Sequence, residues 1–291
     1  MSLYISGSVG YTLMEKDNSY ILLLADVHSG VKYCKQNSIM ISSYLDIMSR
    51  EKDNSILLEE IVRDRFNLME LWPESIHTQE LKKLSQINEK IIPVDIRPML
   101  IPFSWELVES NKKLGTTTLI QYIQLLDDFF NKKSYLYNKY IENIIENISS
   151  NKNLSTISPL IHFNELKLLY DEFKTTYSYY MNSTILYIFN NMIDILNHVN
   201  NMTSMIMEWY IILLVHNNIK NCIIHIGLAH SNKILDLLVD VYKFKIINKM
   251  GLNKMKDINM MGLSDIDTNS SCIMIPQDIR KKYNKKYGFY F

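Results

Sequence analysis

The chain has 291 residues, of which 47% are hydrophobic, so it can bury a sizeable core and does not have the composition of a disordered protein. Its 31 basic and 31 acidic side chains balance. The absence of a basic excess argues against a nucleic-acid-binding protein.

The first part of the chain alternates short apolar runs with helical patterns. The runs are rich in Ile, Leu and Val and bounded by polar residues, and they predict buried strands at YILLLAD (20–26), NSILLEE (54–60) and KIIPVDI (90–96). Helical patterns lie between them at residues 35–50 and 78–90. The turn KDNS (16–19) predicts a hairpin between the first run and the preceding LYISGSVGYTL (3–13).

The middle of the chain is almost free of helix breakers. Residues 104–226 contain a single glycine and a single proline, which predicts a largely helical stretch. Apolar residues at spacings of three and four indicate one helical block at 119–148 and a second at 159–215, with a break near Asn200.

Strand and helix patterns return near the end of the chain. NCIIHIG (221–227) and SSCIMIP (270–276) predict two further strands, with a helix at 231–244 between them. This order predicts an α/β fold: a mostly parallel central sheet flanked by helices and carrying a long helical insertion. We expect the α/β core at residues 1–103 and 219–291, and the insertion at 104–218.

Polar side chains follow four of the predicted strands, at the point where each strand ends. In parallel α/β sheets, functional sites collect outside the carboxyl ends of the strands. The residues there are Asp26 and His28, then Glu59 and Glu60, then Asp95 and Arg97, and finally His225, Gly227 and His230. Taken singly, each is also what ends or caps an ordinary element, and His162, at the start of a helix, is a weaker outside candidate. Together they favour a metal site or acid–base chemistry.

A divalent metal site is the first hypothesis for these residues. His28, Glu59 and His230 would bind the ion and leave positions for water and substrate, as a hydrolytic site requires. Glu60 or Asp95 would accept the proton from that water. Mn, Zn, Co and Fe are not distinguished by this set of ligands.

Supporting roles are expected for the remaining strand-end residues. Asp26 or Asp95 would hold an imidazole N–H or bind the ion directly. Arg97, beside a proline, would pair with a carboxylate or clamp an anionic substrate group. Gly227 would allow a close approach of the backbone or adopt a positive φ. His225 lies inside a predicted strand, where a hydrogen-bonded core histidine is the simpler interpretation.

The segments ADVH, LLEEIVRDR and IIHIGLAH resemble the TraB, Tiki, erythromycin esterase and ChaN-like superfamily. The shared pattern is a first strand ending in His, a second ending in Glu followed by Arg, and a late GxxH after an apolar run. The chain is also similar to uncharacterised members from large DNA viruses, although Ala25 stands where the family commonly has glycine. The resemblance implies one of three activities: metal-dependent peptidase in Tiki-type members, histidine-based esterase, or haem or iron handling in ChaN-like members.

Three functions therefore follow as expectations. The first is a metal-dependent hydrolase of an amide or ester bond, with a peptide or a small ester or amide as substrate. The second is a metal-free esterase-like hydrolase in which His28 or His230 activates water. The third is an inactive binding protein that keeps the fold and uses its helical region to contact a host or viral protein.

Cysteine usage and hydropathy predict the cellular location of the protein. Its three cysteines are far apart and form no CxxC pair, so we expect neither a disulfide framework nor a zinc knuckle. The N-terminus has no signal-peptide pattern, and the most apolar segment is too short to span a bilayer. These features predict a cytoplasmic protein without a membrane role, in the host-cell cytoplasm if the chain is viral.

Overall fold

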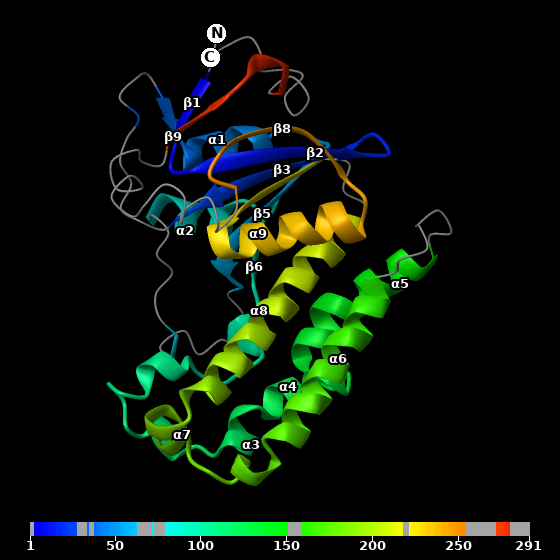
Figure 1. Cartoon of the computed structure of the whole chain (residues 1–291). Coiled ribbons are helices and arrows are strands. Elements are labelled where there is room, and N and C mark those ends of the chain that lie inside the picture. The colour runs from blue at the N-terminus through cyan, green and yellow to red at the C-terminus, as the bar shows by residue number, and fades with distance from the viewer. Residues whose placement is uncertain are drawn as a thin grey trace. The chain divides into compact units, whose positions relative to one another are not determined.

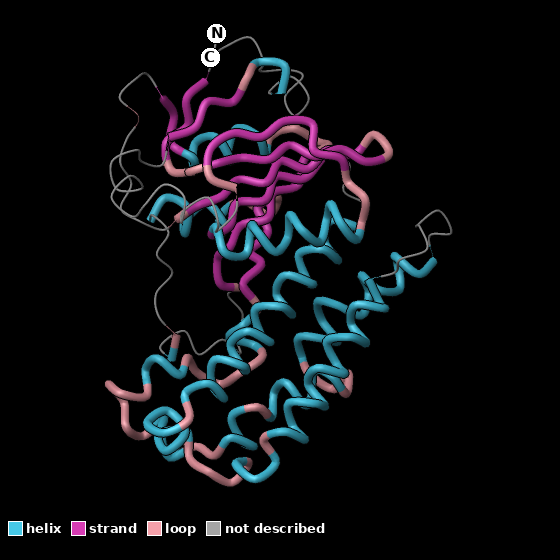
Figure 2. Tube along the Cα trace, in the orientation of Figure 1, coloured by secondary structure: helices cyan, strands magenta, loops and turns pink. Residues whose placement is uncertain are grey.

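A six-stranded sheet organises the α/β part of the protein in the computed structural model (Figures 1 and 2). The structure describes residues 3–27, 34, 38–62, 71–72, 79–150, 159–217, 221–253 and 272–279. The strand order is β6-β5-β7-β3-β2-β8, with bounds β2 (Gly10–Lys16), β3 (Ser19–Asp26), β5 (Asn54–Ile61), β6 (Ile91–Asp95), β7 (Asn221–Gly227) and β8 (Lys245–Gly251). The sheet is mixed and mostly parallel, which confirms the predicted α/β class.

A smaller sheet of three strands carries both ends of the described chain. Its order is β4-β1-β9, with bounds β1 (Leu3–Ser6), β4 (Ser38–Met40) and β9 (Cys272–Ile275). Strand β1 pairs parallel with β4 and antiparallel with β9. The expected strand at 270–276 therefore exists as β9, but the prediction that it joins the mostly parallel sheet is wrong, because it pairs antiparallel with β1 in the smaller sheet. Its isoleucines are nevertheless buried in the hydrophobic core of this part of the protein.

The hairpin between β2 and β3 closes where the sequence predicts it. Asp17 and Asn18 form the turn with positive φ angles of 49° and 64°, which Asp and Asn tolerate better than most residues and which suit a tight two-residue turn. Lys16 pairs with Ser19, and the antiparallel pairing continues to Gly10.

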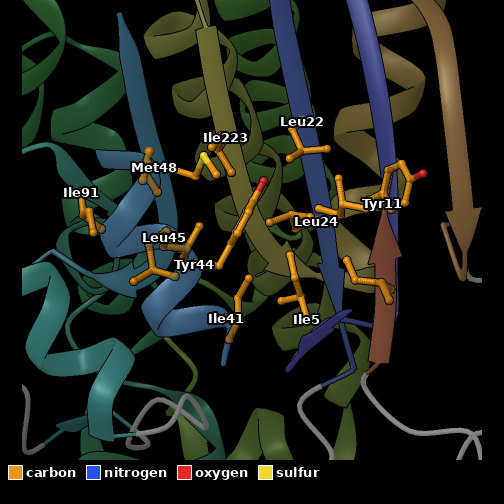
Figure 3. Close-up of a cluster of buried hydrophobic side chains, with 14 of the residues drawn as sticks. Ile5, Tyr11, Leu22, Leu24, Ile41, Tyr44, Leu45, Met48, Ile91 and Ile223 are labelled. Atoms are coloured by element: carbon orange, nitrogen blue, oxygen red, sulfur yellow. The ribbon is translucent and has the colours of Figure 1, made fainter. Parts of the chain in front are cut away.

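One apolar core fills the face of the large sheet that packs against α1 (Ile41–Ser49) and α2 (Gln79–Ile87). Figure 3 shows Tyr44 of α1 lying among side chains from the strands, including Leu24 and Ile223. Ile5 of the small sheet belongs to the same cluster, and Tyr44 is only 1% exposed. These two helices and both sheets therefore share one core.

Helix α9 (Leu228–Asp236) covers the opposite face of the large sheet, with α1 on the other side of β2 and β3 (Figure 1). Its first residue, Leu228, packs with Ala25 of β3 and with Leu252. Because side chains alternate along a strand, Ala25 faces α9, whereas Leu24 faces α1. A π-helical turn at Leu237–Val241 ends this helix, and β8, which was not predicted from the sequence, follows it.

The region from 119 to 216 is helical, as predicted. Its helices are α3 (Leu119–Tyr122), α4 (Gln124–Phe130), α5 (Glu142–Ser150), α6 (Pro159–Thr176), α7 (Ile185–Asn191) and α8 (Ile193–His216). An aromatic cluster forms its centre, where Phe163 lies 5.7 Å from Phe129 and 5.3 Å from Trp209 between ring centroids.

The predicted break near Asn200 is wrong, because α8 continues through that residue. Val199 and Met202 on either side of it are buried, so the apolar face of the helix is uninterrupted. The chain breaks earlier instead, between α6 and α7 and at Met192.

The chain divides into two compact units, each with most of its contacts inside itself. The first, which we call the α/β unit, contains residues 1–60, 76–93 and 218–291, and the second, the helical unit, contains 61–75 and 94–217. None of the helices in the described ranges is long and apolar enough to cross a membrane.

Cys34 and Cys272 form a disulfide bond, so the expectation of no disulfide framework is wrong for this pair. They are 238 positions apart in sequence, and no short spacing could reveal the pair. The pairing of β9 with β1 brings Cys272 opposite Ser6, whose hydroxyl oxygen accepts a hydrogen bond from the Cys34 backbone N–H at 2.9 Å.

Gly10 lies where β2 packs closely against the chain that follows β8. A Cβ atom at this position would lie 1.9 Å from the Leu252 carbonyl oxygen, which is backbone and cannot rotate away. We therefore expect Gly10→Ala to lower the free energy of unfolding by about 2 kcal/mol or more, measured by guanidinium denaturation. Ser43→Ala, at an exposed position of α1, is the control and should change stability by less than about 0.5 kcal/mol. Equal stability of the two variants would contradict this packing.

Candidate functional site

Glu59 lies in the second half of β5, one residue after the pairing of β5 with β7 ends. Their parallel register ends at Leu58 opposite His225. Just beyond this point, the backbone N–H of Gly227 donates a hydrogen bond to Glu59 Oε2 at 2.5 Å. The carboxylate thus takes the place of the backbone acceptor that continued pairing of β5 with β7 would provide.

Strand alternation decides which glutamate faces α9. Leu58 and Ile56 belong to the core beneath α1 and α2, so Glu59 projects to the opposite face, where α9 packs. Glu60, 1% exposed, falls by the same alternation on the α1 side. Of the two glutamates, it is therefore Glu59, the one that the sequence assigned to the expected metal site, that lies near His230.

His230 is the third residue of α9 and faces Glu59. Its Nε2 atom lies 3.6 Å from Glu59 Oε1, and the two side chains are 16% and 8% exposed. This separation exceeds the usual length of a direct hydrogen bond but keeps the imidazole and carboxylate in electrostatic contact. We call these two residues the Glu59–His230 pair.

Gly227 connects β7 to α9 and brings the pair together. It is the N-cap residue of α9, with φ −56° and ψ 146°, so the expectation that it adopts a positive φ is wrong. Its contribution is the N–H that holds Glu59, a group that every residue except proline carries. Asp26, the last residue of β3, lies opposite Gly227 in the parallel register, at the same edge of the sheet.

Ala25 is buried at this edge and contacts the same helix. It is 1% exposed and packs with Leu228, the residue that follows Gly227. Its carbonyl oxygen accepts hydrogen bonds from Ser8 Oγ at 2.8 Å and from the Val9 N–H at 2.8 Å. The methyl group that distinguishes Ala25 from glycine therefore contributes to packing between β3 and α9.

His225 is a buried core histidine. It is 0% exposed, lies opposite Leu58 on the α1 side, and its Nε2 is 3.3 Å from the Gly7 carbonyl oxygen. Because a carbonyl only accepts, this contact requires the tautomer in which Nε2 donates. Alternation thus places His225 on the opposite face of the sheet from Glu59, where it contacts the backbone at Gly7.

Asp95 and Arg97 bind one another within the helical unit. Asp95 Oδ1 accepts from Arg97 Nε and Oδ2 accepts from Nη2, both at 2.8 Å, and the Arg97 backbone N–H adds a bond of 3.2 Å. The Asp95 side chain is 8% exposed, so the ion pair offsets the cost of burying its charge. The predicted pairing of Arg97 with a carboxylate is thus present, with Asp95 as the carboxylate.

Two candidates from the sequence remain, His28 and His162. His28 lies outside the described residues, and so do Arg63 and Arg65 of the quoted Glu-to-Arg segment. His162 is half-buried in α6 of the helical unit, where burial lowers its pKa while the nearby Glu165 and Glu208 carboxylates act in the opposite direction.

Within the part of the chain that the structure describes, no cluster of three or more His, Cys, Asp or Glu side chains could hold a metal ion. Glu59 and His230, two of the predicted ligands, lie near one another there, whereas His28, the third, lies outside the described residues.

Comparisons with protein-family models, with curated proteins and with solved structures returned no match. The structural evidence on function therefore consists of the fold and the Glu59–His230 pair.

The hydrogen bond from Gly227 to Glu59 makes a testable contribution to stability. We expect Glu59→Ala to lower the free energy of unfolding by about 1–3 kcal/mol, because it leaves a buried N–H without its acceptor. Glu59→Gln keeps an acceptor oxygen and should cost less than about 1 kcal/mol.

Chemical denaturation of both variants checks this expectation. Glu89→Ala, at an exposed turn before β6, is the matched control and should lie within about 0.5 kcal/mol of the parent protein. If the glutamine variant is as unstable as the alanine variant, the charge of Glu59 matters and the hydrogen bond does not.

Proposed function

We propose that this protein is a hydrolase of an amide or ester bond, with the Glu59–His230 pair as its catalytic groups. The observation that carries the proposal is the placement of a hydrogen-bonded carboxylate 3.6 Å from an imidazole nitrogen at the carboxyl edge of the sheet. The resemblance of the strand-end segments to the TraB, Tiki and erythromycin esterase superfamily supports the same class of reaction.

The position of the pair in the topology supports a site there. After β5 the chain continues through α2 to β6 on one side, and after β7 it continues through α9 to β8 on the other side. Helices α2 and α9 cover opposite faces of the sheet. Ligand sites of open α/β sheets occur where the connections that follow two neighbouring strands run to opposite sides in this way.

The chemistry that we propose uses His230 as a general base. Glu59, near Nε2, would orient the ring, as carboxylates do beside catalytic histidines. His230 Nδ1 would take a proton from a water molecule while the water oxygen attacks the substrate carbonyl carbon. The imidazolium would then return that proton to the departing amine or alcohol, and the other product is a carboxylic acid.

Replacement of His230 tests this proposal. Purified protein would be assayed with p-nitrophenyl acetate as the ester probe and a mixed fluorogenic peptide library as the amide probe. We expect His230→Ala to lower kcat/KM by about 10²–10⁴-fold without unfolding, because proton transfer contributes factors of that size. His198→Ala is the matched control, because His198 is an exposed histidine of the helical unit that contacts Tyr177.

The outcomes of this assay separate two classes of protein. Full activity of His230→Ala would contradict the proposed catalytic role. An absence of turnover with either probe would favour the binding-protein alternative, in which exposed side chains of the helical unit such as Leu168 and Tyr179 would contact a protein partner.

A metal-dependent hydrolase is the second candidate, and one distance favours it. Two ligands bonded to one zinc-type ion at about 2.1 Å lie roughly 3.4 Å apart at a tetrahedral angle, close to the 3.6 Å between Glu59 Oε1 and His230 Nε2. Glu59 and His230 would hold the ion, with His28 as the third ligand that the sequence predicts. A bound divalent metal would lower the pKa of water toward neutrality.

Elemental analysis and chelation distinguish the two candidates. Metal dependence predicts about one equivalent of Mn, Zn, Co or Fe per chain, loss of activity with EDTA, and loss of metal in both His28→Ala and His230→Ala. The histidine-based reaction predicts activity that EDTA leaves unchanged. Metal-free, fully active protein would exclude the second candidate.

A further inference from the structure

The disulfide between Cys34 and Cys272 joins the chain that follows β3 to the start of β9. We propose that this bond is a reversible redox latch, a thiol modification site whose reduction releases β9 from the core of the α/β unit. The proposal does not depend on the hydrolase activity.

Strand β9 is short and lies at an edge. It is four residues long and belongs to the three-stranded sheet, where its hydrogen-bonded neighbour is β1. Its first residue is Cys272, so the disulfide ties the start of the strand to Cys34.

Release of β9 would uncover apolar surface. Ile273, Ile275 and Ile279 are each at most 1% exposed and belong to the core cluster that also contains Ile5 and Ile41. These contacts oppose opening, and the disulfide adds a covalent constraint to them. Opening of this strand is therefore a local equilibrium that loss of the constraint shifts toward the open form.

The two bonded cysteines differ from the third in their surroundings. Cys34 and Cys272 are both partly exposed, and the backbone N–H of Cys34 binds the hydroxyl of Ser6, which lies 3.1 Å from the hydroxyl of Ser38. Cys222 is fully buried in β7, and burial raises the pKa of its thiol. Thiol exchange is thus confined to the Cys34–Cys272 bond.

The redox step is ordinary thiol–disulfide exchange. A thiolate of a dithiol reductant attacks one sulfur, the Cys34–Cys272 bond breaks, and a mixed disulfide forms. The second thiol of the reductant displaces the protein, which leaves with two thiols, while the reductant leaves as an intramolecular disulfide. A disulfide oxidant of the same class reverses the two steps.

Hydrogen exchange of the full chain tests the latch, with mass spectrometry before and after treatment with dithiothreitol. We expect amide exchange across residues 272–279 to become about tenfold faster or more on reduction, because local opening controls exchange there. Peptides from β3 and β7 should change little. Reoxidation should restore the original rates.

Thiol labelling supplies a second measurement under native conditions. Iodoacetamide should label no cysteine in the oxidised protein and two of the three after reduction, with Cys222 reacting only after denaturation. Cys222→Ala, the matched control, should keep the redox response of β9. Cys34→Ser should show fast exchange without any reductant.

Three results would overturn the proposal. Two labelled cysteines in untreated protein would show that the bond does not form. Unchanged exchange at 272–279 after reduction would show that the disulfide does not restrain β9, and equal acceleration in β3 and β7 would show global loss of stability. If Cys34→Ser does not fold, reduced and alkylated parent protein gives the same comparison.

Discussion

A carboxylate buried in an apolar strand must be hydrogen-bonded, and in this protein a backbone N–H helps to meet that requirement. Glu59 is held by Gly227 just after β5 and β7 cease to pair. Without such a partner, burial of the charge would cost several kcal/mol. The bond therefore fixes the carboxylate at the strand end and also the approach of α9, whose third residue is His230.

The face on which each polar side chain lies follows from the two-residue repeat of the strands. Glu59 and His230 share the α9 side. Glu60, the next residue of β5, and His225, inside β7, fall on the α1 side. A displacement of one residue in β5 would turn Glu59 to the α1 side and separate its carboxylate from His230. The site thus depends on register as much as on residue type.

Much of the α/β part could be predicted from the sequence, because its parallel strands are continuous apolar runs ended by polar residues. Those runs could not show which of Glu59 and Glu60 faces α9, since a strand buried on both faces carries no alternation of hydrophobic and polar residues. Strand β8 was not predicted because all seven of its residues are exposed, so it is not an apolar run. The disulfide was not predicted because its two cysteines come together only when β9 pairs with β1, near the other end of the described chain.

The pairing of β1 with β9 also has a consequence for the order in which the two units form. The core of the α/β unit includes Ile5 and Ile273, so it is incomplete until almost the whole described chain is present. The helical unit is built largely from neighbouring helices of one continuous stretch, and such local contacts form early and fast. During synthesis the helices of this insertion would therefore assemble while the flanking sheet still lacks its last strand.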